Sequence, residues 1–215
     1  MTLKLYFHPL ASFCHKVLIA LYENETPFEP HIVDLADEAQ RSEFMTIWPI
    51  GRMPVLRDEA KKRTVPESSI IIEYLAQYYP GRTRLVPDDA DLALETRLRD
   101  RFYDLYVQEP MQKIVTDRLR PAGSNDPLGV ELAGKLLHTS YDTIEQEMRT
   151  KAWAMGDAFG MADCAAAPAL FYANLVMPLD EAHRNTRSYL DRLMQRPSFA
   201  RTLKEAQPYF ALFPK

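Results

Sequence analysis

Apolar residues alternate with more polar ones at the start of the chain and then change to a helical period. Between Leu3 and Phe7, every second side chain is apolar, which is the two-residue repeat of a strand. From Phe13 to Leu21, apolar residues recur three or four positions apart, which places them on one face of a helix. The sequence therefore predicts a strand followed directly by an amphipathic helix.

Strand and helix patterns continue to alternate up to residue 79. Residues 29–35 predict a second strand, and an irregular or helical segment follows it. Residues 53–67 predict two short strands joined by a charged turn, and residues 68–79 predict a helix with one apolar face. This order of elements indicates an α/β sandwich built on a mixed sheet.

The pattern changes after two prolines and a glycine within residues 80–89. We expect a first domain at residues 1–80, a linker at 81–87 and a second domain at 88–215. Beyond the linker no strand pattern occurs, and four stretches carry apolar residues at helical spacing, which predicts an all-α bundle. These stretches are residues 91–107, 129–148, 161–176 and 186–196.

The overall composition limits the classes of function. The chain has 215 residues, 47% of them hydrophobic and 26% charged, which is typical of a globular protein. Its formal net charge of -4 argues against sequence-independent binding to nucleic acid, which needs a basic face. No apolar stretch approaches the roughly 20 residues that span a bilayer, and the sequence MTLKLYF lacks the features of a secretion signal. We therefore expect neither a nucleic-acid nor a membrane partner.

The cysteines and histidines suggest a reducing compartment and no metal. Cys14 and Cys164 lie far apart, whereas a secreted disulfide scaffold would be richer in cysteine. The five histidines are scattered without the spacing of metal ligands. We expect a cytoplasmic protein with no metal site.

Ser12 and Cys14 lie where the first predicted helix begins. The free N–H groups of that first turn favour an anion, and a serine hydroxyl there can donate a hydrogen bond to a thiolate and lower the thiol's pKa. Ser12 could equally be a helix cap, and Cys14 a small buried apolar residue. A local C-x-x-C redox pair would need a cysteine at position 11, where the chain has Ala11, so that chemistry is excluded.

Two later stretches carry groups suited to a peptide ligand. Pro54 opens a strand, and a cis Met53–Pro54 bond, in place of the usual trans form, would turn the backbone of Met53 outward to pair with an extended peptide. Ser68 at a helix N-terminus could hold a carboxylate, and Glu67 before it could hold an ammonium group. Taken singly, the two stretches are also typical of a strand edge and a capped helix.

In combination and order, these three features resemble the cytosolic glutathione transferases, of the bacterial type closest to the theta, beta and zeta classes. The likeness covers essentially the whole chain, and its most specific stretches are MPVL at 53–56 and VPESSIIIEYL at 65–75. It implies a thioredoxin-like N-terminal domain followed by an all-helical domain, glutathione as co-substrate, no metal, and a homodimer.

The resemblance also implies which residues bind the tripeptide. The backbone of Met53 would pair with its cysteinyl part, and Pro54 would be cis. Glu67 and Ser68 would bind the γ-glutamyl end. Arg52 matches a position at which a basic residue often meets the glycyl carboxylate.

At the sulfur, the resemblance implies that Ser12 faces the glutathione thiolate. Members of the family differ in which residue of the first turn touches sulfur, and Ala11 occupies a position that is serine or cysteine in some classes. Cys14 lies close by, so we treat it as an auxiliary or redox-sensitive residue.

A second departure from the family pattern lies before the predicted helix 161–176. Many relatives begin this segment with a serine or threonine that forms a capping box with Asp163, whereas this chain has Gly160. We expect Asp163 to accept backbone N–H bonds and fix the start of that helix, which is a folding role.

The expected activity is attack of the glutathione thiolate on an electrophilic carbon of a small hydrophobic molecule, a detoxification reaction. The acceptor would bind in the cleft between the domains, where Tyr103 and Tyr106 either line the pocket or belong to the core or a subunit interface. Two alternatives remain: a glutathione-dependent disulfide or peroxide reductase, and a non-catalytic binding or regulatory protein. The presence of both Glu67 and Ser68 counts against the second.

Overall fold

The computed structural model describes residues 2–214 and contains a four-stranded mixed sheet. The strands lie in the order β2-β1-β3-β4; β1 is parallel to β2 and antiparallel to β3, and β3 is antiparallel to β4. The predicted mixed sheet is therefore confirmed. The strands are β1 (Leu3–Phe7), β2 (Glu29–Ile32), β3 (Val55–Asp58) and β4 (Arg63–Pro66).

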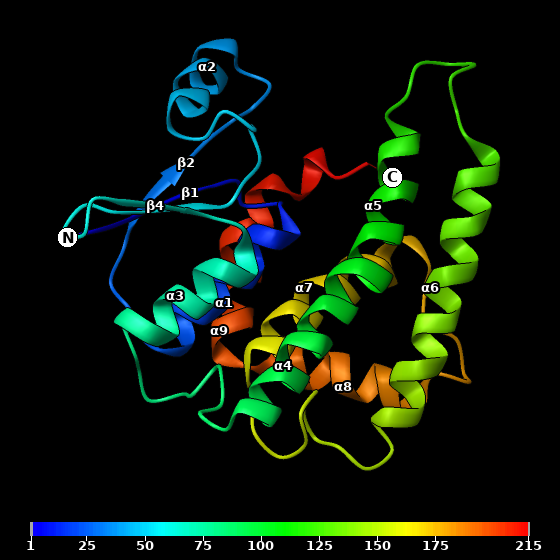
Figure 1. Ribbon diagram of the computed structural model, residues 1–215. Helices are drawn as coiled ribbons and strands as arrows, with labels where there is room; N and C mark the ends of the chain where they lie inside the picture. The colour runs from blue at the N-terminus through cyan, green and yellow to red at the C-terminus, as the bar shows by residue number, and fades with distance from the viewer. Residues whose placement is uncertain (1, 215) are drawn as a thin grey trace.

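Three helices cover the two faces of this sheet (Figure 1). Helices α1 (Ser12–Glu23) and α3 (Ser68–Tyr78) pack on the face that carries Leu5. Helix α2 (Glu38–Ile47), in the segment expected to be irregular or helical, places Phe44 against the opposite face. The alternation of side chains along β1 thus fills a separate apolar cluster on each side of the sheet.

The second part of the chain is helical, as predicted, and α7 runs through its core. The segment between α3 and α4 holds no helix or strand, and the predicted linker falls within it. No helix of residues 2–214 is long and apolar enough to cross a bilayer. The helices are α4 (Ala90–Phe102), the π-helix η1 (Tyr103–Gln108), α5 (Glu109–Arg118), α6 (Pro127–Glu147), α7 (Met161–Val176), α8 (Arg184–Gln195), α9 (Pro197–Ala206) and the 3₁₀ helix η2 (Gln207–Leu212).

The apolar residues of α4 face outward, which the sequence pattern did not indicate. The helix buries the small and polar residues Ala93, Thr96 and Asp100, whereas Leu94 and Leu98 are 66% and 57% exposed. The single helix predicted over residues 91–107 is also interrupted, because the π-helix η1 begins at Tyr103. The elements that pack against α4 determine which of its faces is buried. Its exposed leucines remain available to contact another molecule.

Asp163 fixes the start of α7, as expected. Its carboxylate accepts hydrogen bonds from the N–H groups of Ala154 (2.8 Å) and Gly160 (2.9 Å) and from the Tyr189 hydroxyl (2.5 Å). Burial raises the pKa of Asp163 to about 6, although these bonds oppose the rise. The side chain therefore joins the loop before α7 to α8 and has a structural role.

A buried ion cluster joins α1 to α4 and η1. The Lys16 ammonium lies 2.6 Å from an Asp100 carboxylate oxygen and 2.8 Å from one of Asp104, and all three side chains are almost fully buried. Lys16 also donates to the Ser69 hydroxyl, which in turn donates to Asp100 at 2.6 Å. Arg101 contacts Asp104 from the solvent side. Two carboxylates around one buried ammonium tie the sheet domain to the helical domain through charge.

We expect Lys16→Met to lower the free energy of unfolding by about 3–5 kcal/mol, because it leaves two buried carboxylates without their cation. Urea denaturation measures the change. Burial raises the pKa of Asp104, so the loss should shrink as the pH falls and that carboxyl takes up a proton.

The matched control is Lys135→Met, which removes the lysine of an exposed pair with Glu131 on α6 and should cost less than about 1 kcal/mol. Equal losses in the two variants would show that the buried cluster contributes no more than a surface ion pair.

Candidate functional site

All five residues predicted to bind a tripeptide line one cavity of about 140 Å³. All five belong to the sheet domain, where they lie in the segment before β3 and at the N-terminus of α3. They are Arg52, Met53, Pro54, Glu67 and Ser68. Residues separated by more than a dozen positions thus reach a single opening.

The Met53–Pro54 peptide bond is cis, which the resemblance implied. Pro54 is buried and directly precedes β3, while Met53 is half-buried and packs against the apolar clusters on both faces of the sheet. Arg52 is exposed at the same edge. This segment therefore presents backbone and one cation to the cavity.

Glu67 and Ser68 meet the cavity where α3 begins. Glu67 occupies the N-cap position with φ of 68° and ψ of 119°, a conformation that costs a residue with a side chain on the order of 1–3 kcal/mol. Ser68 is the first residue of α3, and its backbone N–H is one of the free donors of a helix N-terminus. The arrangement sets a carboxylate beside a group of anion-binding N–H donors.

Ser12 lies beside the cavity rather than lining it. It is the first residue of α1, after Ala11 at the N-cap position, and it is 7% exposed. Ser12 borders a crevice that is too narrow for a water molecule. Phe13 and Asp104 line both this crevice and the cavity. The hydroxyl is thus close to the site, at the end of α1 where an anion is favoured.

Cys14 does not reach the cavity. Its side chain is fully buried in the apolar cluster beneath α1, and burial raises the pKa of the thiol to about 12. A protonated, inaccessible thiol is a poor nucleophile. The neighbouring His15 is also fully buried, its ring bonds to the Pro9 carbonyl at 2.5 Å, and burial lowers its pKa to about 4.

The helical domain supplies four of the ten residues that line the cavity, and the sequence reasoning missed these residues. They are Arg101, Asp104, Leu105 and Glu109, joined by Phe13 of α1. The sequence carried no signal for them, because its apolar pattern pointed to the leucine face of this helix and left Asp100 and Asp104 on the opposite side. Of the two tyrosines considered for an acceptor pocket, Tyr103 is buried in the core and Tyr106 is exposed; neither lines this cavity.

Gln108 is a further polar group next to the site. Both the oxygen and the nitrogen of its side-chain amide are buried without a hydrogen-bond partner among the described residues. It borders the crevice that also contains Ser12. Unpaired buried amides are rare and costly, and one beside a cavity is available to a ligand.

Charges of both signs surround the cavity. Arg52 and Arg101 can meet carboxylates, whereas Glu67 and Glu109 can meet an ammonium group. Asp104 is already neutralised by Lys16 and Arg101. The arrangement suits a small zwitterionic ligand with more than one carboxylate.

Comparison with known proteins agrees with this geometry. Residues 5–83 match the glutathione S-transferase N-terminal domain, and residues 127–192 match the glutathione S-transferase C-terminal domain. The glutathione S-transferase GstB of Escherichia coli (strain K12) is 25% identical over 185 residues, which cover 85% of this chain and 88% of GstB.

Solved structures show the same architecture. A glutathione S-transferase of Methylobacillus flagellatus, crystallised with GSH bound, superposes with a TM-score of 0.85 at 24% identity, over 94% of this chain and 98% of that one. A glutathione S-transferase of Methylobacterium radiotolerans, in complex with glutathione sulfonate, gives a TM-score of 0.81 at 26% identity over 94% of both chains. The thioredoxin-like domain, the helical domain and the two matched sequence regions together show that this chain belongs to the glutathione S-transferase family.

Proposed function

We propose that this protein binds glutathione in the cavity and transfers its thiolate to small hydrophobic electrophiles. The observation that carries the proposal is that Arg52, Met53, Pro54, Glu67 and Ser68 line one cavity beside the N-terminus of α1. A relative of 26% identity was solved with glutathione sulfonate, which supports a ligand of this class.

The tripeptide would lie extended across the sheet domain. Its γ-glutamyl carboxylate would accept from the backbone N–H and hydroxyl of Ser68, and its ammonium group would face Glu67. The cysteinyl part would pair with the backbone of Met53, and the glycyl carboxylate would meet Arg52. Arg101 offers a second cation across the cavity.

Ser12 would stabilise the thiolate. Lowering a thiol pKa from about 9 to below 7 requires about 3 kcal/mol, since one pKa unit equals about 1.4 kcal/mol. One charge-assisted hydrogen bond together with the helix N-terminus supplies free energy of that order. No proton-transferring triad is required.

A glutathione-dependent reductase acting through Cys14 is the second candidate, and the structure gives it less support. A mixed disulfide at Cys14 would need an accessible thiolate, whereas this thiol is buried and its pKa is raised. Faster turnover of hydroxyethyl disulfide than of chlorodinitrobenzene would favour the reductase.

We also propose a homodimer that uses the outer face of α4. Leu94 and Leu98 are exposed there, and Ile70 of the adjoining α3 is 53% exposed. The Arg97–Glu73 ion pair joins the two helices, and exposed apolar side chains on adjoining helices are typical of an interface. Sedimentation equilibrium should give the mass of two chains, and Leu98→Glu should shift the equilibrium towards one chain; a monomeric wild-type protein would exclude the dimer.

Calorimetry with glutathione tests the proposed site. We expect binding by the wild-type protein and a loss of about tenfold or more in affinity for Glu67→Gln, because one charge-assisted bond to the ammonium group is removed. Glu131→Gln on the exposed face of α6 is the control and should bind as the wild type does. Absence of heat in the wild-type titration would overturn the proposed function.

The role of Ser12 is tested through the pH dependence of turnover with chlorodinitrobenzene. We expect Ser12→Ala to bind glutathione nearly as well as the wild type and to raise the pH at which turnover appears by about one to two units, since the lost bond is worth about 1.5–3 kcal/mol. Ser124→Ala, at an exposed serine before α6, should leave the profile unchanged. An identical profile for Ser12→Ala would reject the role.

A further inference from the structure

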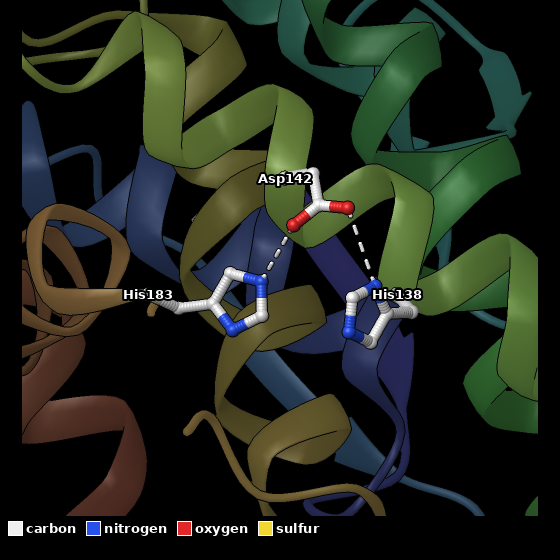
Figure 2. Close-up of side chains that lie close together, drawn as sticks. All are labelled: His138, Asp142 and His183. Carbon is white, nitrogen blue, oxygen red and sulfur yellow. Dashed lines mark hydrogen bonds and ion pairs between the residues drawn. The ribbon is translucent and has the colours of Figure 1, made fainter. Parts of the chain in front are cut away.

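A cluster of candidate metal ligands lies where α6 meets the start of α8 (Figure 2). His138 and Asp142 stand one turn apart on α6, and His183 directly precedes α8. One ligand atom from each side chain lies within 4.8 Å of the others. None of the three lines the proposed glutathione cavity. They form a separate feature of the helical domain.

The two imidazoles approach the two oxygens of a single carboxylate. His138 Nδ1 lies 3.3 Å from one Asp142 oxygen, and His183 Nε2 lies 3.1 Å from the other. Bonds of about 2.0–2.1 Å to a tetrahedral Zn²⁺ place neighbouring ligand atoms about 3.3 Å apart. Figure 2 shows both imidazole rings turned towards the carboxylate between them. Because the three ligand atoms lie within 4.8 Å of one another, the side chains would have to close by up to about 1.5 Å to surround such an ion.

His183 is buried with a carboxylate near its second ring nitrogen. Its side chain is 2% exposed, and its Nδ1 lies 2.8 Å from an Asp180 oxygen, although the two groups are not aligned for a hydrogen bond. The Asp180 carboxylate is itself fixed, because it accepts the N–H of Ala182 at 2.8 Å. A carboxylate near the second ring nitrogen is common around metal-binding histidines, and here Nε2 is the nitrogen that faces Asp142.

The ligand types restrict the ion. Two imidazole nitrogens and one carboxylate suit Zn²⁺ and other late first-row divalent ions, whereas Mg²⁺ and Ca²⁺ prefer oxygen ligands. His138 and Asp142 are both exposed, so an ion can enter and a water molecule can take the fourth position. The same distances would also suit two ion pairs between the imidazoles and the Asp142 carboxylate, and a titration with Zn²⁺ separates the two cases.

We propose that His138 Nδ1, the Asp142 carboxylate and His183 Nε2 bind a divalent ion of the zinc class. The ion would join α6 to the start of α8 and stabilise the helical domain. This proposal departs from the expectation of a metal-free protein, which rested on the separation of the histidines along the sequence.

Calorimetry of tag-free, chelator-treated protein with Zn²⁺ alone, without glutathione, tests the site. We expect about one ion per chain, a rise in Tm on binding, and visible absorption bands of tetrahedral geometry when Co²⁺ replaces Zn²⁺. His138→Gln and Asp142→Asn should each weaken binding at least tenfold and abolish the rise in Tm. Both positions are exposed, so the variants should fold.

His31→Gln is the matched control, since it removes an imidazole paired with Glu29 in the sheet domain and should bind Zn²⁺ as the wild type does. The proposal is overturned if the wild-type protein binds no Zn²⁺, or if His138→Gln binds it as tightly as the wild type. Either result would leave the three side chains as ion pairs only.

Discussion

The burial of Lys16 between the two domains is the constraint on which the site depends. An ammonium group can be removed from water only where opposite charges and hydrogen-bond acceptors surround it. Asp100 and Asp104 supply the charges, and Ser69 supplies an acceptor. These contacts fix the positions of α1, α3 and the α4–η1 segment relative to one another. The cavity opens where the three meet.

The same cluster positions residues that face the cavity. Asp104 and Arg101 belong to both the ion cluster and the cavity lining, and Ser69 directly follows Ser68. The π-helix over Tyr103–Gln108 turns Asp104 inward and Leu105 towards the cavity. Such local widening of a helix is frequent at functional sites. A ligand in this cavity would therefore contact groups whose positions are set by the stability of the domain interface.

In two parts of the molecule, a buried nitrogen-containing side chain lies between two carboxylates. Around Lys16, two carboxylates hold a buried cation. Around His183, Asp142 and Asp180 face the two nitrogens of a buried imidazole. In both cases a group that is costly to bury lies between two carboxylates that come from separate helices or loops. Such polar contacts specify one arrangement of the packed elements, whereas apolar contacts alone tolerate several arrangements.

The sequence by itself determined the order of elements, the mixed sheet and the helical second part, because the two-residue and 3.6-residue periods are local properties of the chain. It also indicated the stretches around Pro54 and Glu67, whose residue types are tied to special backbone positions. Only the tertiary structure decided which residues of α4 are buried, that Cys14 is withdrawn from the site, and that Arg101 and Asp104 reach the cavity. These outcomes depend on which elements pack together, and the residue pattern of one helix does not specify which other elements pack against it. For the same reason, the separation of 41 positions between Asp142 and His183 concealed a cluster that the fold brings together.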